Sequence, residues 1–227
     1  MKSQVTRKER RPDWEKLYET AAAQEGLFTT VQAAEAGYSP QLIAKHLGNG
    51  RFARVRRSVY RLVHFPPGEH EDLVAVWLWS ERACVFSHET ALALHGLSDA
   101  LPSRVHLTLP AAWLPRRLRV PEGVIVHHAD VGKKEMSWVG PVPVTSIART
   151  IIDCADAQVA PDVVRDAFEQ AADQGLVRRD SVPQVVSYLK GFFSVSHSRS
   201  GPRFGSASGS RSGSRTRSSS GAAARTR

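Results

Sequence analysis

Apolar spacing and helix-capping signals near the start of the chain predict the first two of three short helices. The first helix is predicted over 14–24 by apolar residues three and four positions apart, namely Trp14, Leu17, Tyr18 and Ala21. A second helix should follow Thr29, because Gln32 stands three residues later, at the spacing of a capping box. Gly37 should close this helix, since a helix commonly ends at a residue that tolerates a positive φ.

A third helix is predicted from Ser39 to Leu47. Ser39 is a favourable N-cap, and Pro40 suits the first helical position, where its missing N–H costs nothing. The inward stripe consists of Leu42, Ile43 and Leu47. The outward face is left with Gln41, Ala44 and Lys45. Two short helices with these caps are typical of a helix-turn-helix, whose second helix enters the major groove of DNA.

A basic two-stranded ribbon is predicted directly after the third helix. Eleven residues without an acid contain five arginines, which are Arg51, Arg54, Arg56, Arg57 and Arg61. They are interleaved with strand-forming residues, the turn is expected at Arg57-Ser58, and the arginines are expected to face outward together. An ordinary surface hairpin also carries exposed arginines. We favour a DNA-contacting wing, because helix-turn-helix and ribbon occur in the right order.

The chain after the ribbon predicts a second region, and the fold class is α+β. Pro66-Pro67-Gly68 marks a boundary, because it continues neither a helix nor a central strand. Helices are expected over 71–82, 88–94, 146–155 and 162–174, followed by a last helix that ends at Lys190. Strands are expected over 104–109, 118–120, 124–128 and, at a sheet edge because of its two prolines, 141–144. Helices and short strands in this order indicate a mixed α+β domain.

Four parts of the chain are predicted from these patterns. They are a disordered basic arm over 1–12, a winged helix-turn-helix domain over 13–64, an α+β domain over 69–193 and a disordered tail over 194–227. The tail is rich in Ser, Gly and Arg and has almost no apolar residues to form a core. Either it adds nonspecific affinity for phosphates or it is an unselected extension; both alternatives stay open.

The net charge of +9 resides mainly at the two ends of the chain. Residues 1–12 hold five Lys or Arg and one Glu, and the residues after Val195 hold seven Arg and no acid. The rest of the chain is therefore slightly acidic, and its positive charge is expected to be concentrated in the ribbon. This distribution favours a directed contact with nucleic acid over a diffuse one.

The two cysteines and the apolar runs indicate the compartment. Cys84 and Cys154 lie in apolar surroundings and are expected to be buried thiols, since a disulfide framework needs more cysteines. The charged N-terminus lacks the apolar core of a signal peptide. The longest apolar run, 73–79, is too short to span a membrane. We therefore expect a cytoplasmic protein without membrane contact.

Catalytic, cofactor and metal sites are not predicted. His88 and His95 share a helical face but lack the additional ligands of a metal site, so structural histidines are expected. His127 and His128 are neighbours on a strand and should point to opposite faces, so they cannot bind one ligand together. A phosphate-binding glycine loop, a nucleophile elbow and a zinc signature are all absent from the sequence. We therefore expect no enzymatic activity and no cofactor.

Several segments resemble the AbiEi-family antitoxins of type IV toxin–antitoxin systems. Within residues 15–190 these segments are LFTTVQAAEAGYS, GRFARVRRSVYRL, VFSHETALALHGLSDALPSRVHLTLP and PVPVTSIARTIIDCAD. Ser58 departs from the glycine expected in the ribbon turn. The resemblance implies an N-terminal winged helix-turn-helix that binds promoter DNA and represses its own operon. It also implies a C-terminal domain that counteracts a nucleotidyltransferase-like toxin.

The expected partner is double-stranded promoter DNA, bound as a homodimer if the operator is palindromic. Gln41 and Lys45 are the candidates for base contacts, because Gln favours adenine and Lys favours guanine. Thr29 and Thr30 suit a phosphate contact at a helix N-terminus. The full set of predicted DNA-binding residues is Thr29, Thr30, Ser39, Gln41, Lys45, Arg51, Arg54, Arg56, Arg57 and Arg61.

Two alternatives to the antitoxin hypothesis stay open. The chain could be a transcriptional regulator or protein-interaction module unrelated to a toxin, with the winged domain as a scaffold. It could also be a remnant of a fused winged-helix and nuclease-like protein. Retention on promoter DNA distinguishes the scaffold, and metal-dependent loss of DNA strands distinguishes the nuclease.

Overall fold

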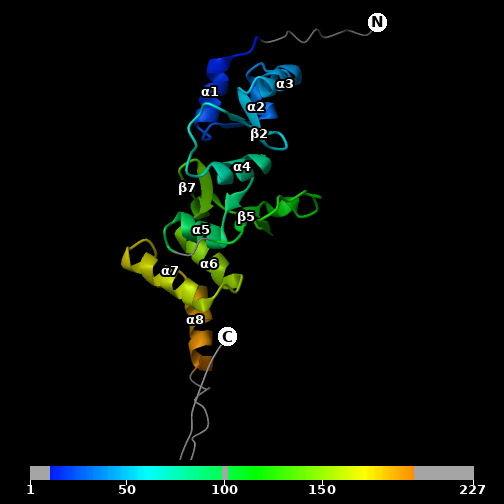
Figure 1. The fold of residues 1–227 in the computed structure, drawn as a ribbon. Helices are drawn as coiled ribbons and strands as arrows, with labels where there is room; N and C mark the ends of the chain where they lie inside the picture. The colour runs from blue at the N-terminus through cyan, green and yellow to red at the C-terminus, as the bar shows by residue number, and fades with distance from the viewer. Residues whose placement is uncertain (1–10, 99–101, 197–227) are drawn as a thin grey trace, which may run out of the picture.

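The computed structural model describes residues 11–98 and 102–196. Figure 1 shows an elongated chain, with the N-terminal helices at one end, a β-sheet in the middle and α7 and α8 at the other end. The predicted class is confirmed: a winged helix-turn-helix is followed by a mixed α+β region. Residues 1–10 of the predicted arm and 197–227 of the predicted tail lie outside the described residues.

The N-terminal unit packs three helices on one face of a three-stranded antiparallel sheet of order β1-β3-β2. Its elements are α1 (Trp14–Ala22), β1 (Leu27–Thr29), α2 (Thr30–Glu35), α3 (Pro40–Gly48), β2 (Phe52–Arg56) and β3 (Val59–Leu62). The core below the helices includes Leu17, Phe28, Ile43 and Phe52, and the Phe28 and Phe52 rings meet edge to face at 5.0 Å. The prediction contained the three helices and the ribbon but not β1.

The other face of this sheet packs on α4 (Glu71–Trp79). Leu27 and Val59 from the first sheet share one apolar cluster with α4 and with Leu107 and Val142 of the second sheet. Four residues of α4 are buried: Val74, Ala75, Val76 and Leu78. The core is therefore continuous across residues 64–69, and the domain boundaries proposed from the sequence stay a prediction.

The second sheet has five strands in the order β6-β5-β4-β8-β7. They are β4 (Val85–Phe86), β5 (Val105–Leu109), β6 (Val124–His128), β7 (Met136–Val139) and β8 (Val142–Thr145). β5 pairs with β6, and β4 with β8, in parallel; the other pairs are antiparallel. The strands predicted over 104–109 and 124–128 correspond to β5 and β6.

Two strand predictions were wrong. The segment at 141–144 is not an edge, because β8 is buried and lies between β4 and the edge strand β7. Pro143 is tolerated there because β8 pairs with β4 at a single position, Phe86 with Val144, so few ladder hydrogen bonds are lost. Residues 118–120 form no strand and belong to the long connection between β5 and β6.

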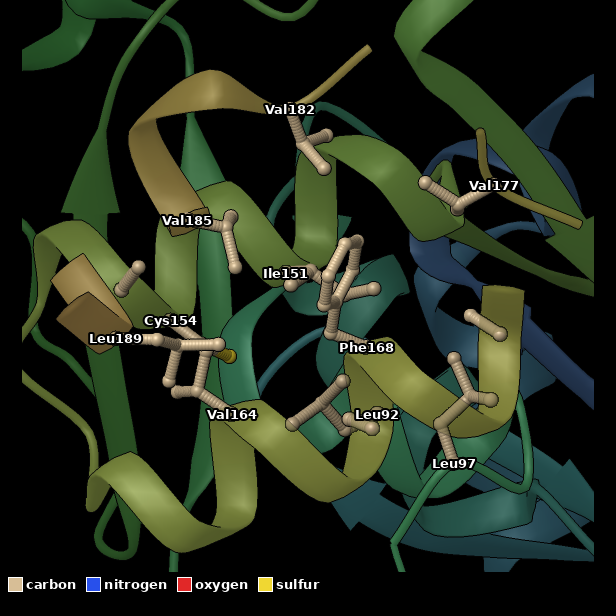
Figure 2. Close-up of a cluster of buried hydrophobic side chains, with 13 residues drawn as sticks. Leu92, Leu97, Ile151, Cys154, Val164, Phe168, Val177, Val182, Val185 and Leu189 are labelled. Carbon is tan, nitrogen blue, oxygen red and sulfur yellow. The ribbon is translucent and has the colours of Figure 1, made fainter. Parts of the chain in front are cut away.

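The remaining helices pack against each other and on the second sheet. They are α5 (His88–Leu94), α6 (Ile147–Asp156), α7 (Pro161–Asp173) and α8 (Pro183–Ser196), together with two short 3₁₀ helices, η1 (Ala111–Trp113) and η2 (Lys133–Glu135). Figure 2 shows their apolar cluster, in which Leu92, Ile151, Phe168 and Val185 meet. α8 continues to Ser196, so it passes the predicted end at Lys190 and includes the first three residues assigned to the tail.

The cysteines follow the prediction. Cys84 and Cys154 are free and buried. Burial raises the pKa of the Cys84 thiol to about 12, so this group remains a protonated, unreactive core residue. Across residues 11–98 and 102–196, every helix falls short of the length and apolar character that crossing a bilayer requires.

Candidate nucleic-acid interface

The start of α2 is fixed by a capping box, as predicted. Thr29 Oγ1 accepts a hydrogen bond from the Gln32 N–H at 3.2 Å, and Gln32 Oε1 accepts one from the Thr29 N–H at 2.8 Å. The buried Gln32 amide also donates to Gln24 Oε1 at 2.8 Å, and the Gln24 amide donates to the Leu27 carbonyl at 2.9 Å. This polar network fixes α2 relative to α1 and β1.

The second helix of the pair, α3, presents the predicted outward face. Ser39 caps it by accepting a hydrogen bond from the Leu42 N–H at 3.2 Å, and Pro40 occupies the first helical position. Ile43 is buried against the core, whereas Gln41 and Lys45 are exposed. The side of α3 that would meet DNA is therefore accessible and is not covered by the second sheet.

The arginines of the ribbon do not all face the same way, which corrects the prediction. Arg54 stands opposite Tyr60, whereas Arg56 stands opposite Val59, and a β-bulge lies between the two arginines. Tyr60 packs on the core beneath α1–α3, and Val59 packs on the α4 side of the sheet. Arg54 and Arg56 therefore leave opposite faces of the ribbon, because the pleat alternates and the bulge inserts one residue.

Arg61 has a structural contact, contrary to its predicted place among outward-facing groups. Its Nε lies 2.9 Å from Glu71 Oε1, and its Nη2 donates to the Phe65 carbonyl at 3.0 Å. Both side chains of the ion pair are mostly buried. Arg61 therefore joins β3 to α4, because the pleat directs it with Val59 toward the second sheet.

Two donors expected to meet a phosphate at the start of α2 are already bonded. The Thr30 N–H donates to the Ser58 carbonyl at 3.0 Å, and the Thr29 N–H donates to Gln32. These bonds join the turn of the ribbon to α2 and leave neither N–H free. Thr29 and Thr30 line one wall of a groove, and their phosphate contact stays a prediction.

This groove is a cavity of about 1070 Å³ between the ribbon turn with α2 and the connection from β5 to β6. Figure 1 shows the connection, coloured green after β5, projecting to one side of the molecule. Six arginines line the groove: Arg56, Arg57, Arg82, Arg116, Arg117 and Arg119. Three acids share the lining, Glu35, Glu81 and Glu122. The groove therefore has an excess of positive charge.

The arginines of the connection were not predicted as part of the interface. Residues 116–119 contain three arginines and no acid, which was the available signal. Only the tertiary structure shows that they stand across a groove from the ribbon. Arg116 also stacks on Trp113, with its guanidinium carbon 3.9 Å from the ring centre. The sequence predicts that the positive charge of the folded part is concentrated in the ribbon. The structure shows that the connection between β5 and β6 also carries positive charge.

The histidines are arranged differently from the sequence interpretation. His88 and His95 make separate contacts, because His95 Nε2 lies 2.7 Å from the Thr145 carbonyl. His127 is half-buried and His128 exposed, as the strand pattern predicts. His127 instead meets His88 and His106, one from α5 and one from β5. This group could hold a metal ion, and the sequence interpretation did not include it.

Comparison with known proteins identifies the N-terminal unit. Residues 15–63 match the family described as "Transcriptional regulator, AbiEi antitoxin". No curated protein matches the chain. The crystal structure of the RV2827C protein from Mycobacterium tuberculosis is similar at 15% identity and a TM-score of 0.38, covering 77% of this chain and 79% of that chain. The match covers the helix-turn-helix and the ribbon, and it confirms that this unit resembles the AbiEi antitoxin family of transcriptional regulators.

Proposed function

We propose that the protein binds the promoter of its own toxin–antitoxin operon through α3 and the ribbon and represses that operon. The observation that carries this proposal is the exposed polar face of α3 beside a ribbon of arginines, within the segment that matches the AbiEi regulators. A capped helix with free polar side chains next to a basic hairpin suits insertion into the major groove with phosphate contacts at its side.

Base recognition is assigned to Gln41 and Lys45, the exposed side chains of α3 that can reach base edges. Arg51, Arg54 and Arg57 are exposed and are assigned to the DNA backbone. Ser39 acts through its capping bond, which orders the start of α3. Arg61 is left out of the DNA contacts, because Glu71 holds its guanidinium.

A second run of phosphates is assigned to the groove. Arg56 and Arg57 line one wall, and Arg116, Arg117 and Arg119 line the opposite wall. Each phosphate neutralised by an arginine adds about −0.9 to the slope of log affinity against log salt on duplex DNA. Four contacts from the ribbon give a slope of about −4, and three further contacts from the connection bring it to about −6.

The test uses the full chain and a fluorescent duplex from the promoter, with binding followed by anisotropy at several salt concentrations. Arg54→Ala combined with Arg56→Ala should weaken binding to every sequence and reduce the salt slope by about 2. The matched control removes two arginines from the opposite end of the molecule, Arg178→Ala with Arg179→Ala, both of which are exposed. If the ribbon variant binds like wild type at low and high salt, the ribbon is not a DNA contact.

The base contacts are tested separately on α3. Lys45→Ala or Gln41→Ala should cost about 1–3 kcal/mol on the preferred sequence and little on random duplex DNA, because each removes a contact to one base edge. Equal losses on both kinds of DNA would assign these side chains to the phosphates.

The antitoxin part of the proposal concerns the toxin. We infer that the protein counteracts a nucleotidyltransferase-like toxin encoded beside it. The support is the family match together with a further apolar cluster, formed by α5–α8, to which the DNA-contacting helices contribute no residue. Co-expression of the neighbouring reading frame with and without this chain tests it: growth should stop with the toxin alone and resume with both. Failure to restore growth would leave a DNA-binding regulator without antitoxin activity.

A further inference from the structure

Three histidines that are distant in the sequence meet beside the second sheet. His88 is the first residue of α5, His106 lies on β5 and His127 lies on β6. One ring nitrogen from each lies within 4.8 Å of those of the other two. His106 and His127 occupy the same sheet face as Thr108, because Thr108 pairs directly with His127 in the parallel ladder. The fold thus brings all three imidazoles together beside the sheet.

We propose that His88, His106 and His127 form a binding site for a divalent transition-metal ion, with Zn²⁺ as the best-fitting ion. Three imidazoles are an established ligand set for zinc, with a fourth position left to water. The proposal does not depend on DNA binding, because α3 and the ribbon contribute no ligand.

The distance between two of the ligands suits tetrahedral zinc. His106 Nδ1 lies 3.2 Å from His127 Nε2. Two nitrogens bound to one tetrahedral ion at 2.0–2.1 Å are about 3.4 Å apart. Bringing these nitrogens onto a common ion therefore requires only a small movement. The His88 ring is also close, since it stacks on the His127 ring with 3.7 Å between their centres and 15° between their planes. An imidazole binds a metal ion in its ring plane, so the His88 ring has to turn out of this stack to become the third ligand.

The hydrogen bonds around His106 orient it as a ligand. Its Nε2 lies 3.3 Å from a carboxylate oxygen of Glu89. A carboxylate only accepts, so Nε2 carries the proton and Nδ1 presents its lone pair toward His127. A carboxylate bound to the remote nitrogen of a histidine is the usual second contact of a metal-binding imidazole. His88 Nδ1 lies 2.9 Å from the Ser87 hydroxyl, which accepts a hydrogen bond from Thr108 Oγ1 at 2.8 Å.

Burial lowers the pKa of His88 to about 3, and burial also lowers the pKa values of His106 and His127. The His88 backbone has a φ of +53°, in the left-handed region that a β-carbon disfavours. The backbone of His88 is therefore strained, and the surrounding structure holds it in this conformation.

Metal titration of the untagged, chelator-treated full chain tests the proposal. Co²⁺ should bind with one equivalent per chain and give the strong visible absorption of a tetrahedral site, and Zn²⁺ should displace it. Zn²⁺ at about 100 times its Kd should raise the Tm by roughly 5–10 °C. The titration is done without DNA, so its outcome is separate from the proposed repressor function.

Variants assign the binding to these residues. His127→Gln or His106→Gln should weaken Co²⁺ binding at least tenfold, and Glu89→Gln should weaken it about tenfold through the orientation of His106. The matched control is His128→Gln, the exposed neighbour on the same strand, which should bind like wild type. Equal loss in the His128 variant, or unchanged binding in the His127 variant, overturns the site. The wild-type protein tests the site without any substitution: no saturable Co²⁺ binding, or an octahedral Co²⁺ spectrum, also overturns it.

Discussion

Ser58 lies at the turn of the ribbon with a φ of +64°, where an L-residue is strained and glycine is favoured. Its carbonyl accepts the hydrogen bond from the Thr30 N–H, so the strained turn also positions α2. The side chain of Ser58 is exposed, and its replacement therefore changes backbone strain without changing the core.

Substitution of Ser58 tests this strain. Ser58→Val should destabilise the protein by about 1–2 kcal/mol, because a β-branched residue fits the left-handed region poorly. Ser58→Gly should be neutral or stabilise it by up to about 1 kcal/mol. Urea denaturation measures both changes. Ser137→Val, at an exposed position of the strand β7, is the control and should have little effect. A Ser58→Val variant as stable as wild type would contradict the strained turn.

At the scale of elements, α3 is a helix of nine residues whose order depends on its ends. Helices of this length are marginal in isolation, so capping and packing decide whether the first turn forms. Ser39 supplies the cap and Ile43 supplies the buried anchor. The exposure of Gln41 and Lys45 then follows from the helical period, because it does not depend on contacts made by these two side chains.

Removal of the cap should disturb α3. Ser39→Ala should lower the free energy of unfolding by about 1 kcal/mol, because the Leu42 N–H loses its partner. Ser39→Thr retains the hydroxyl and is the control. Chemical denaturation gives the stability, and anisotropy should show weaker promoter binding only for the alanine variant. Equal stability of both variants would show that the cap contributes nothing.

The connection between β5 and β6 is the second element on which the interface depends. Replacement of Arg116, Arg117 and Arg119 by alanine should reduce the salt slope by up to about 3 without changing the preferred sequence, since arginine side chains at phosphates do not read bases. Promoter and random duplexes are compared by anisotropy. A change in sequence preference, or an unchanged slope, would show that the groove does not hold the DNA backbone.

At the scale of the whole molecule, the DNA-contacting unit and the second sheet share a core. α4 lies between Leu27 and Val59 on one side and Leu107 on the other. Polar contacts across the junction add to this packing: the His70 N–H donates to Glu25 Oε2 at 3.0 Å, and Arg61 pairs with Glu71. The two sheets are therefore expected to open together and not as separate units.

Hydrogen exchange tests this coupling. Leu107→Ala removes a fully buried side chain from β5 and should destabilise the protein by about 2–5 kcal/mol. Exchange followed by mass spectrometry should accelerate in β1 and β3 as well as in β5. As a control, Val177→Ala changes the distant helical cluster. Acceleration confined to the second sheet in the Leu107 variant would indicate independent units.

The sequence by itself determined the elements that depend on local signals. The caps at Thr29 and Ser39 and the turn at Ser58 form from contacts within a few residues, so their positions and the exposure of Gln41 and Lys45 follow from spacing. The α+β class and the helix-turn-helix with its ribbon follow from the same signals, and the family match confirms this unit.

The tertiary structure decided what depends on contacts between distant segments. Strand order placed β8 inside the sheet and paired β5 with β6, which brought His106 to His127. Packing of α4 on both sheets turned Arg61 toward Glu71 and set Arg117 across a groove from Arg57. Neither strand pairing nor helix packing is encoded in local spacing, because both depend on which apolar faces meet, and that is fixed only when the whole core forms.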